Sequence, residues 1–284
     1  MATNQQRREA AKRKLDHQLE HRAQRAKRNR IVGVAAVIGA VVLIAGLIVF
    51  LATRESPQSE PAAAEDEQAG QEQPRIQIPT ERAAVPERST PLPDPQSCQY
   101  PAGQEEPAKQ VSPPKDGKVP STGTVEVTFA SSAGDIPMTL DRALAPCTVN
   151  STLHLIEQGF YDNTECHRLG TQGLQMLQCG DPSGTGSGGP GYTVPDEFFP
   201  ELSYGRGILA MANTGQPNSG GSQFFMVFGQ AELPPNYTVF GTISDAGLNV
   251  LDKIAHAGDD GSYEPSPGGG KPNTPVKISE VIVQ

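Results

Sequence analysis

The stretch that decides the fold runs from residue 166 to residue 225 and contains four short motifs. They are CHR at 166–168, MLQCGDPSGTGSGGPGYTVPDEF at 176–198, GILAMAN at 207–213 and GSQFF at 221–225. Short apolar runs bounded by Gly, Pro and Asp are typical of β-strands joined by turns. The order of the motifs therefore predicts strands that set an arginine, a glutamine, a methionine and a phenylalanine around one groove.

The surrounding residues extend this pattern to a folded domain over 122–284. Residues 124–130 and 135–140 predict a β-hairpin, and helices are expected from Pro146 to Gly159 and over 248–255. Eight strands and two helices favour a mainly β fold, an eight-stranded closed antiparallel barrel capped by two helices. The other strands are expected at 164–169, 176–179, 208–213, 223–228, 239–243 and 276–283.

Taken together and over the whole of 122–284, the motifs resemble the cyclophilin family of peptidyl-prolyl cis-trans isomerases. The resemblance implies closure of the barrel and isomerisation of X–Pro bonds, with no metal, cofactor or covalent intermediate. It also implies proline-containing peptides as substrates. The functional residues that it implies are the catalytic Arg168 and Gln178 and the substrate-binding Met176, Ala212, Asn213, Gln223, Phe225, Leu233 and Tyr237.

Each group has an expected role in such a reaction. When the amide twists, the prolyl nitrogen regains a lone pair, so a fixed Arg168 guanidinium donates to it more strongly than to the planar ground state. Gln178 would position Arg168 or the preceding carbonyl, and the Asn213 backbone would pair with the peptide main chain. Met176, Phe225 and Leu233 would hold the proline ring.

The chain departs from the family pattern at several positions. The segment between Arg168 and Gln178 is two residues longer than usual, and Gln175 stands where a pocket phenylalanine is expected. Glu232 replaces the usual tryptophan and Tyr237 a common histidine, and loss of the indole implies weak cyclosporin binding at most. The insertion and Gln175 favour an alternative function, a catalytically weak proline-peptide binding module or holdase.

Other chemistries fit the sequence less well. The glycines of 184–191 formally match a dinucleotide fingerprint, but Pro190 and Gly191 follow at once, so no helix starts there to bind a phosphate. Ser222 lies in no G-x-S-x-G elbow. Cys166 and His167 are neighbours in an expected strand and would point to opposite faces. We therefore expect no nucleotide, hydrolase or thiol chemistry, and no metal site.

Four cysteines allow three pairings into two disulfides: Cys98, Cys147, Cys166 and Cys179. If Arg168 and Gln178 both face the groove in regular strands, Cys166 and Cys179 lie on opposite faces. This parity disfavours a bridge between those two. We expect Cys98 and Cys147 each to pair with one of them, which would join the domain to the segment before it.

The N-terminal part predicts a membrane anchor. Residues 1–30 contain ten Lys or Arg and three acidic residues, a local charge of +7 in a chain of net charge −9. Residues 31–52 are uncharged and overwhelmingly apolar, and at 1.5 Å per residue they would span roughly 33 Å. The positive-inside rule then predicts a cytoplasmic N-terminus, a single transmembrane helix and an extracytoplasmic catalytic domain.

Residues 53–121 are rich in Pro, Glu, Gln and Ala and contain one aromatic residue, Tyr100. Such a composition cannot bury enough apolar surface to offset its ordering entropy, so a disordered linker is expected. Exported unfolded proteins are the expected partners of a domain held there, together with the membrane. No nucleic-acid partner is expected, because orientation in the membrane already explains the basic segment.

Overall fold

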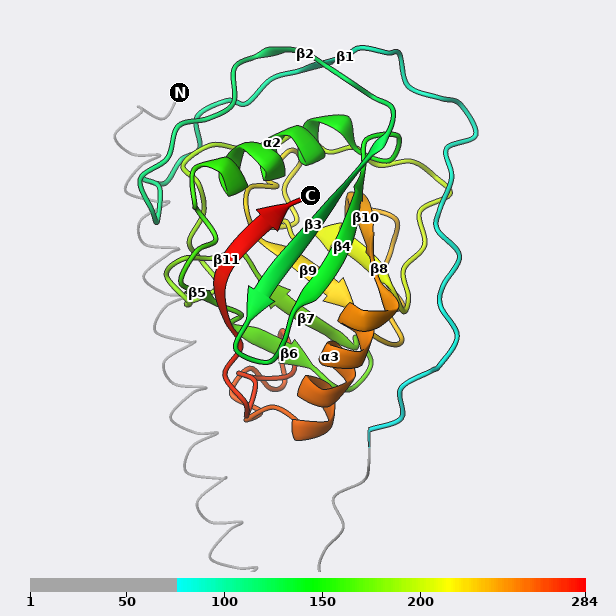
Figure 1. The fold of residues 1–284 in the computed structure, drawn as a ribbon, viewed down its shortest axis with the longest axis vertical. Coiled ribbons are helices and arrows are strands. Elements are labelled where there is room, and N and C mark those ends of the chain that lie inside the picture. Colours follow the sequence, from blue (N-terminus) through cyan, green and yellow to red (C-terminus); the bar gives the residue numbers. More distant parts are fainter. Residues whose placement is uncertain (1–75) are drawn as a thin grey trace, which may run out of the picture. The chain divides into compact units, whose positions relative to one another are not determined.

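The computed structural model describes residues 76–284. The predicted basic segment 1–30, the predicted membrane helix 31–52 and the first part of the predicted linker lie outside the described residues. Among the residues from 76 onward, no helix is both long and apolar enough to cross a membrane. Figure 1 shows a curled sheet with helices α2 and α3 at opposite ends. The prediction of a mainly β fold with two helices is confirmed for the described part of the chain.

The elements follow the predicted order closely. Two segments, β7 and β10, have the predicted bounds, and the others differ by a few residues at their ends. The helices are α2 (Pro146–Glu157) and α3 (Asp245–Ala257); the strands are β1 (Gln96–Cys98), β2 (Gly117–Val119), β3 (Thr124–Ser131), β4 (Ile136–Asp141), β5 (Thr164–Glu165), β6 (Arg168–Gly170), β7 (Met176–Cys179), β8 (Ile208–Met211), β9 (Phe224–Val227), β10 (Val239–Ile243) and β11 (Lys277–Val283).

The main sheet of the domain pairs its strands antiparallel and has the strand order β5-β11-β3-β4-β10-β8-β9-β7-β6. It differs from the expected closed barrel of eight strands, because the expected strand 164–169 is interrupted. The expected strand is divided into β5 and β6, which form the two edges of the sheet. Only Cys166 and His167 separate them in the sequence. The Cys166 N–H donates to Val276 and the His167 N–H to Gln178, so backbone hydrogen bonds continue on both sides of the break.

An aromatic cluster fills the interior of the curled sheet. Phe129 of β3, Tyr161 after α2 and Phe224 of β9 are almost fully buried. Their ring centroids lie 5.3–5.8 Å apart in tilted or edge-to-face pairs. Such pairs contribute about 0.5–1.5 kcal/mol each beyond the burial of their area. The cluster therefore fixes β9, which carries part of the site, against β3 on the other side of the core.

Helix α2 begins at the expected Pro146, whereas α3, predicted over 248–255, extends further at both ends. Pro146 occupies the first turn of α2, where its missing N–H costs no hydrogen bond, and Gly159 after the helix has φ of +64°, a conformation that glycine adopts without strain. At α3 the Ser244 hydroxyl accepts a hydrogen bond from the Gly247 N–H at 3.1 Å. These residues fix where each helix begins or ends.

The prediction of a disordered linker is wrong for residues 76–121, which we call the strap. Its strands β1 and β2 pair with each other, and Cys98, Tyr100 and Val119 are buried. The Tyr100 hydroxyl donates to the Cys147 carbonyl of α2 and accepts from Asn150. The composition argument failed because the strap does not need a core of its own, since it docks on the surface of the domain.

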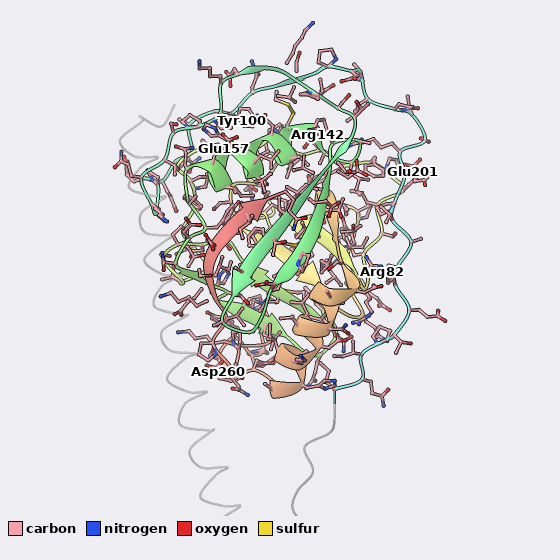
Figure 2. All side chains as sticks on the ribbon, in the orientation of Figure 1. Arg82, Tyr100, Arg142, Glu157, Glu201 and Asp260 are labelled. Atoms are coloured by element: carbon pink, nitrogen blue, oxygen red, sulfur yellow. A yellow bond between two sulfur atoms is a disulfide. The ribbon has the colours of Figure 1, made fainter. Side chains whose placement is uncertain are left out.

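Polar side chains of the strap extend this docking along the molecule. The Arg88 guanidinium donates to the carbonyls of Leu144 and Glu197, and the Lys109 ammonium donates to three carbonyls just after α2. Arg82 pairs with Asp245 of α3 at 2.8 Å. Figure 2 labels Arg82 near α3 and Tyr100 beside α2. The strap therefore reaches from one end of the sheet to the other.

The expected disulfide pairing is also wrong. The bridges are Cys98–Cys147, between the strap and α2, and Cys166–Cys179, with Cα atoms 4.0 Å apart. The parity argument assumed a regular strand through 164–169, but the strand breaks at Cys166 and His167. The break lets Cys166 meet Cys179 while Arg168 still pairs with Gln178.

Candidate active site

Arg168 and Gln178 face each other across neighbouring strands. They are directly opposite in the antiparallel pairing of β6 with β7. One Nη atom of Arg168 donates to the Gln178 Oε1 at 3.4 Å, and the arginine is half-buried. Burial lowers the pKa of Arg168, but a guanidinium stays protonated in proteins. The structure brings the two predicted catalytic residues together.

Two further acceptors hold the guanidinium from a loop that the sequence analysis missed. The Arg168 Nε donates to the Gly268 carbonyl at 3.0 Å, and the second Nη donates to the Pro267 carbonyl at 2.6 Å. The Gly269 N–H donates to a Glu264 carboxylate oxygen at 2.7 Å within the same loop. A sequence signal exists in the Pro- and Gly-rich run 265–270 before the last strand, but backbone acceptors leave no side-chain signature.

Gln178 continues the hydrogen bonding away from Arg168. Its Nε2 donates to the Gln223 Oε1 at 2.9 Å, and the Gln223 Nε2 donates to the carbonyls of Gly186 and Gly188 at 3.0 and 2.9 Å. Each amide thereby has a defined orientation. The Gly-rich loop is thus connected through two glutamines to the guanidinium.

Asp181 gives the Gly-rich loop its shape. Its buried carboxylate accepts hydrogen bonds from the N–H groups of Ser183, Thr185 and Gly186 and from the Ser183 hydroxyl. Burial alone would raise the pKa of Asp181, but these hydrogen bonds outweigh it, so the pKa lies below its ordinary value. The loop is therefore built around an ionised carboxylate.

The predicted apolar residues split into a buried and a half-buried pair. Met176 and Phe225 are 1% and 5% exposed, whereas Leu233 and Tyr237 are half-buried and pack against the core. The rings of Phe225 and Tyr237 meet edge to face at 5.5 Å. Tyr237 is held in turn by Tyr204, whose hydroxyl donates to the Tyr237 carbonyl at 2.9 Å. Leu233 and Tyr237 are the members that a bound ring could contact most readily.

The main chain at Asn213 is free for an extended peptide. Within residues 76–284 its backbone N–H and carbonyl make no hydrogen bond, whereas the Ala212 N–H donates to the Gln223 carbonyl at 2.9 Å. The Asn213 side chain is used locally, with Nδ2 donating to the Asn236 carbonyl and Oδ1 accepting from the Gly215 N–H. An extended peptide can pair with unpaired main-chain groups of this kind.

Gln175 does not line the groove. It is 6% exposed, and its side-chain amide donates to the Gln77 carbonyl of the strap while its oxygen accepts from the Gln230 N–H. The two-residue insertion before it forms a turn at which Gly173 has φ of +69°. The residue at the expected phenylalanine position therefore anchors the strap.

His167 directly precedes β6 and is 5% exposed. Burial lowers its pKa, with the Asp181 charge acting in the opposite direction. Neither ring nitrogen has a hydrogen-bond partner among the described residues. Cys166, in a disulfide, cannot act as a nucleophile beside it. In the described part of the chain no cluster of His, Cys, Asp and Glu could hold a metal ion.

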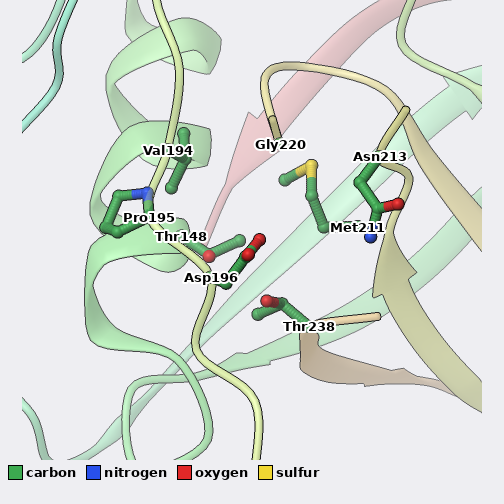
Figure 3. Close-up of a pocket in the computed structure, with 8 residues that line it drawn as sticks. All are labelled: Thr148, Val194, Pro195, Asp196, Met211, Asn213, Gly220 and Thr238. Atoms are coloured by element: carbon green, nitrogen blue, oxygen red, sulfur yellow. The ribbon is translucent and has the colours of Figure 1, made fainter. Parts of the chain in front are cut away.

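Two hollows lie near Asn213. The larger is a groove of about 690 Å³ with Gln178 and Gln223 among its lining residues, next to the Arg168 pair. The smaller has a volume of about 10 Å³, which holds at most about one water molecule, so it is no ligand site. Figure 3 shows the residues that line it, which are Thr148, Val194, Pro195, Asp196, Met211, Asn213, Gly220 and Thr238.

Comparison with known proteins adds a family assignment to this geometry. Residues 124–283 match the model of the family described as cyclophilin type peptidyl-prolyl cis-trans isomerase/CLD. A "Probable peptidyl-prolyl cis-trans isomerase B" of Mycobacterium leprae is 43% identical over 277 residues, covering 91% of this chain and 92% of that protein. The Mycobacterium tuberculosis (strain H37Rv) protein of the same name is 45% identical over 201 residues, covering 66% of this chain and 64% of its own length. A Streptomyces anulatus "Peptidyl-prolyl cis-trans isomerase B" is 38% identical over 175 residues, covering 55% of this chain and 95% of that protein.

Proposed function

Because this chain belongs to the cyclophilin-type peptidyl-prolyl cis-trans isomerase family, we propose that it interconverts the cis and trans forms of X–Pro bonds in peptide substrates, with Arg168 as the catalytic donor. Rotation about the amide faces a barrier of roughly 18–20 kcal/mol from partial double-bond character. A catalyst needs to stabilise the twisted amide, in which the prolyl nitrogen becomes a hydrogen-bond acceptor.

The observation that carries the proposal is the hydrogen bonding of Arg168. A guanidinium has five N–H donors. Three are used, towards Gly268, Pro267 and Gln178. One N–H therefore remains on each Nη atom, on a group that is already oriented. A donor fixed before the substrate binds stabilises the transition state without a reorganisation cost.

The surrounding residues would orient the peptide. Leu233, Tyr237 and Phe225 would receive the proline ring, and the unpaired main chain of Asn213 would pair with the peptide backbone. Gln178 would act through Arg168 as a positioning residue, held by Gln223. Positioning of this kind lowers the entropic part of the barrier.

We also propose that the enzyme is membrane-anchored and assists the folding of exported proteins. The apolar run 31–52 and its basic flank support this location. Two disulfides in the described residues support it independently, because disulfides persist in oxidising compartments.

One observation favours the second candidate, a proline-peptide binding module with little catalysis. Arg168 already donates to two carbonyls of its own loop, so its remaining donors could be too constrained to follow a twisting amide. The two candidates differ in a single observable, the rate of prolyl exchange.

The test is NMR exchange spectroscopy on a short Ala–Pro peptide with catalytic amounts of the full chain in mild detergent. Uncatalysed exchange takes tens to hundreds of seconds, so an isomerase gives exchange cross-peaks within a mixing time of about a second. Peptide binding without faster exchange would leave the binding module as the function. If the chain neither binds the peptide nor speeds its exchange, both candidates are contradicted.

A further inference from the structure

The groove beside Arg168 has one wall that lies outside the residues matched by the family model, which begin at 124. This wall is the strap segment 102–106, and the facing walls are 186–193 and 212–223. Gln178 and Gln223 line the end of the groove that adjoins the catalytic arginine. A peptide bound at Arg168 and continuing along the groove would therefore contact the strap.

Backbone hydrogen bonds fix the strap wall in place. The Gly103 N–H donates to the Gly191 carbonyl at 2.8 Å, and the Ala108 N–H donates to the Gly189 carbonyl at 2.9 Å. These bonds lie on both sides of residues 104–106. The side chains between them thus project from an anchored segment, tied to the same Gly-rich loop that holds Gln223.

The charge of the groove comes from the strap alone. Glu105 and Glu106 are the only charged residues among those that line it, and both are exposed. Neither forms an ion pair with any residue between 76 and 284. The groove therefore carries two negative charges that the described protein does not neutralise.

We propose that Glu105 and Glu106 are specificity-determining residues that select peptides with Lys or Arg among the residues preceding the X–Pro bond. The proposal rests on the proposed isomerase function and names its substrate class. With the proline ring at Phe225 and Leu233, the groove that begins at Gln178 and Gln223 receives the chain on the other side of the amide. That side carries the residues before the bond.

The size of the effect follows from the exposure of the two carboxylates. Exposed ion pairs are weak, so a basic residue is expected to raise kcat/KM about two- to tenfold over an acidic one. The Debye length falls from about 10 Å at 0.1 M salt to about 3 Å at 1 M, so the preference should largely disappear at high salt. A preference from shape or apolar contact would not respond in this way.

The experiment compares peptides of equal length with Lys, Ala or Glu two residues before an Ala–Pro bond, and one with Lys two residues after it. Isomerisation is measured by NMR exchange with the full chain and with the Glu105→Gln, Glu106→Gln double variant. The native chain should favour Lys before the bond, and in the variant the rates on the Lys, Ala and Glu peptides should become similar.

A matched control is the Glu81→Gln, Glu87→Gln double variant, which removes the same charge from exposed strap positions outside the groove. It should keep the native preference. Equal loss in both double variants, a native preference for Lys after the bond, or no preference at all would overturn the inference. Failure to isomerise even the Ala peptide would instead contradict the proposed function.

Discussion

At the scale of single residues, Gln175 has a different role from the one that the family pattern assigns to its position. In the sequence it stands where a pocket phenylalanine is expected, which predicts that a phenylalanine there would rebuild the pocket wall and tighten peptide binding. In the structure its amide instead joins Gln77 of the strap to Gln230, and the side chain is buried. The surroundings of residue 175 therefore favour a side chain that can form these two hydrogen bonds.

Gln175→Phe is accordingly expected to destabilise the protein. The Gln77 carbonyl and the Gln230 N–H would lose their partner, and each lost hydrogen bond costs about 0.5–1.5 kcal/mol. Urea unfolding of the full chain measures this loss. Gln172→Phe, at an exposed neighbouring position, is the control and should change stability little. Tighter peptide binding by Gln175→Phe at unchanged stability would show that the side chain faces the substrate.

At the scale of elements, the Gly-rich loop 184–191 illustrates what a sequence pattern leaves open. Its glycines exclude a helix and predict an irregular loop, which the structure confirms. The organising residue is Asp181, which the sequence does not single out, because its partners are mainly backbone N–H groups. The loop in turn orients Gln223 through two carbonyls.

Asp181→Asn should destabilise the loop in a pH-dependent way. The folded pKa of Asp181 is lowered, so its carboxylate contributes stability above the ordinary pKa of about 3.9, and this is lost as pH falls further. The variant should be about 1–3 kcal/mol less stable at neutral pH. The difference from the native chain should shrink below about pH 4. Denaturant melts between pH 3 and pH 7 measure it, and a pH-independent difference would contradict the ionised state.

The strands that carry the site were predictable because short buried runs of fixed order leave few choices. β7 and β10 match their predicted bounds, and Gln178, Gln223 and Asn213 line one groove. Arg168 adjoins that groove through its hydrogen bond to Gln178. The disulfide pairing and the loop acceptors of Arg168 were missed for a related reason. Local sequence patterns do not reveal a break in a strand, such as the one at Cys166. They also do not reveal backbone acceptors that are distant in sequence.

At the scale of the whole molecule, the strap changes the boundary of the catalytic unit. A segment that its composition marks as unable to fold alone lies on the domain, supplies a groove wall and is joined to α2 by Cys98–Cys147. Composition predicts autonomous folding, which is a different property from docking on an existing surface. The unit that should be expressed and tested therefore begins well before residue 122.

The two disulfides should have different consequences when removed. Cys98→Ser with Cys147→Ser opens a loop of 49 residues and should cost about 4 kcal/mol in the chain-entropy model. Cys166→Ser with Cys179→Ser opens a loop of 13 residues and should cost about 3 kcal/mol, but it loosens the strands that carry Arg168. Urea melts and kcat/KM on one Ala–Pro peptide separate these effects. The expected result is a larger loss of kcat/KM, relative to the loss of stability, when Cys166–Cys179 is removed. A larger relative loss when Cys98–Cys147 is removed would contradict this expectation.

The most direct measurement uses the Arg168→Ala variant. It compares the loss of prolyl exchange rate with the loss of peptide affinity, each relative to the native chain. If the guanidinium acts mainly in the twisted transition state, kcat/KM should fall by about 10²-fold or more, by analogy with loss of an oriented donor, while the peptide Kd changes much less. NMR exchange and titration of the same Ala–Pro peptide give both quantities. A parallel loss in both, or an unchanged exchange rate, would contradict the role assigned to Arg168.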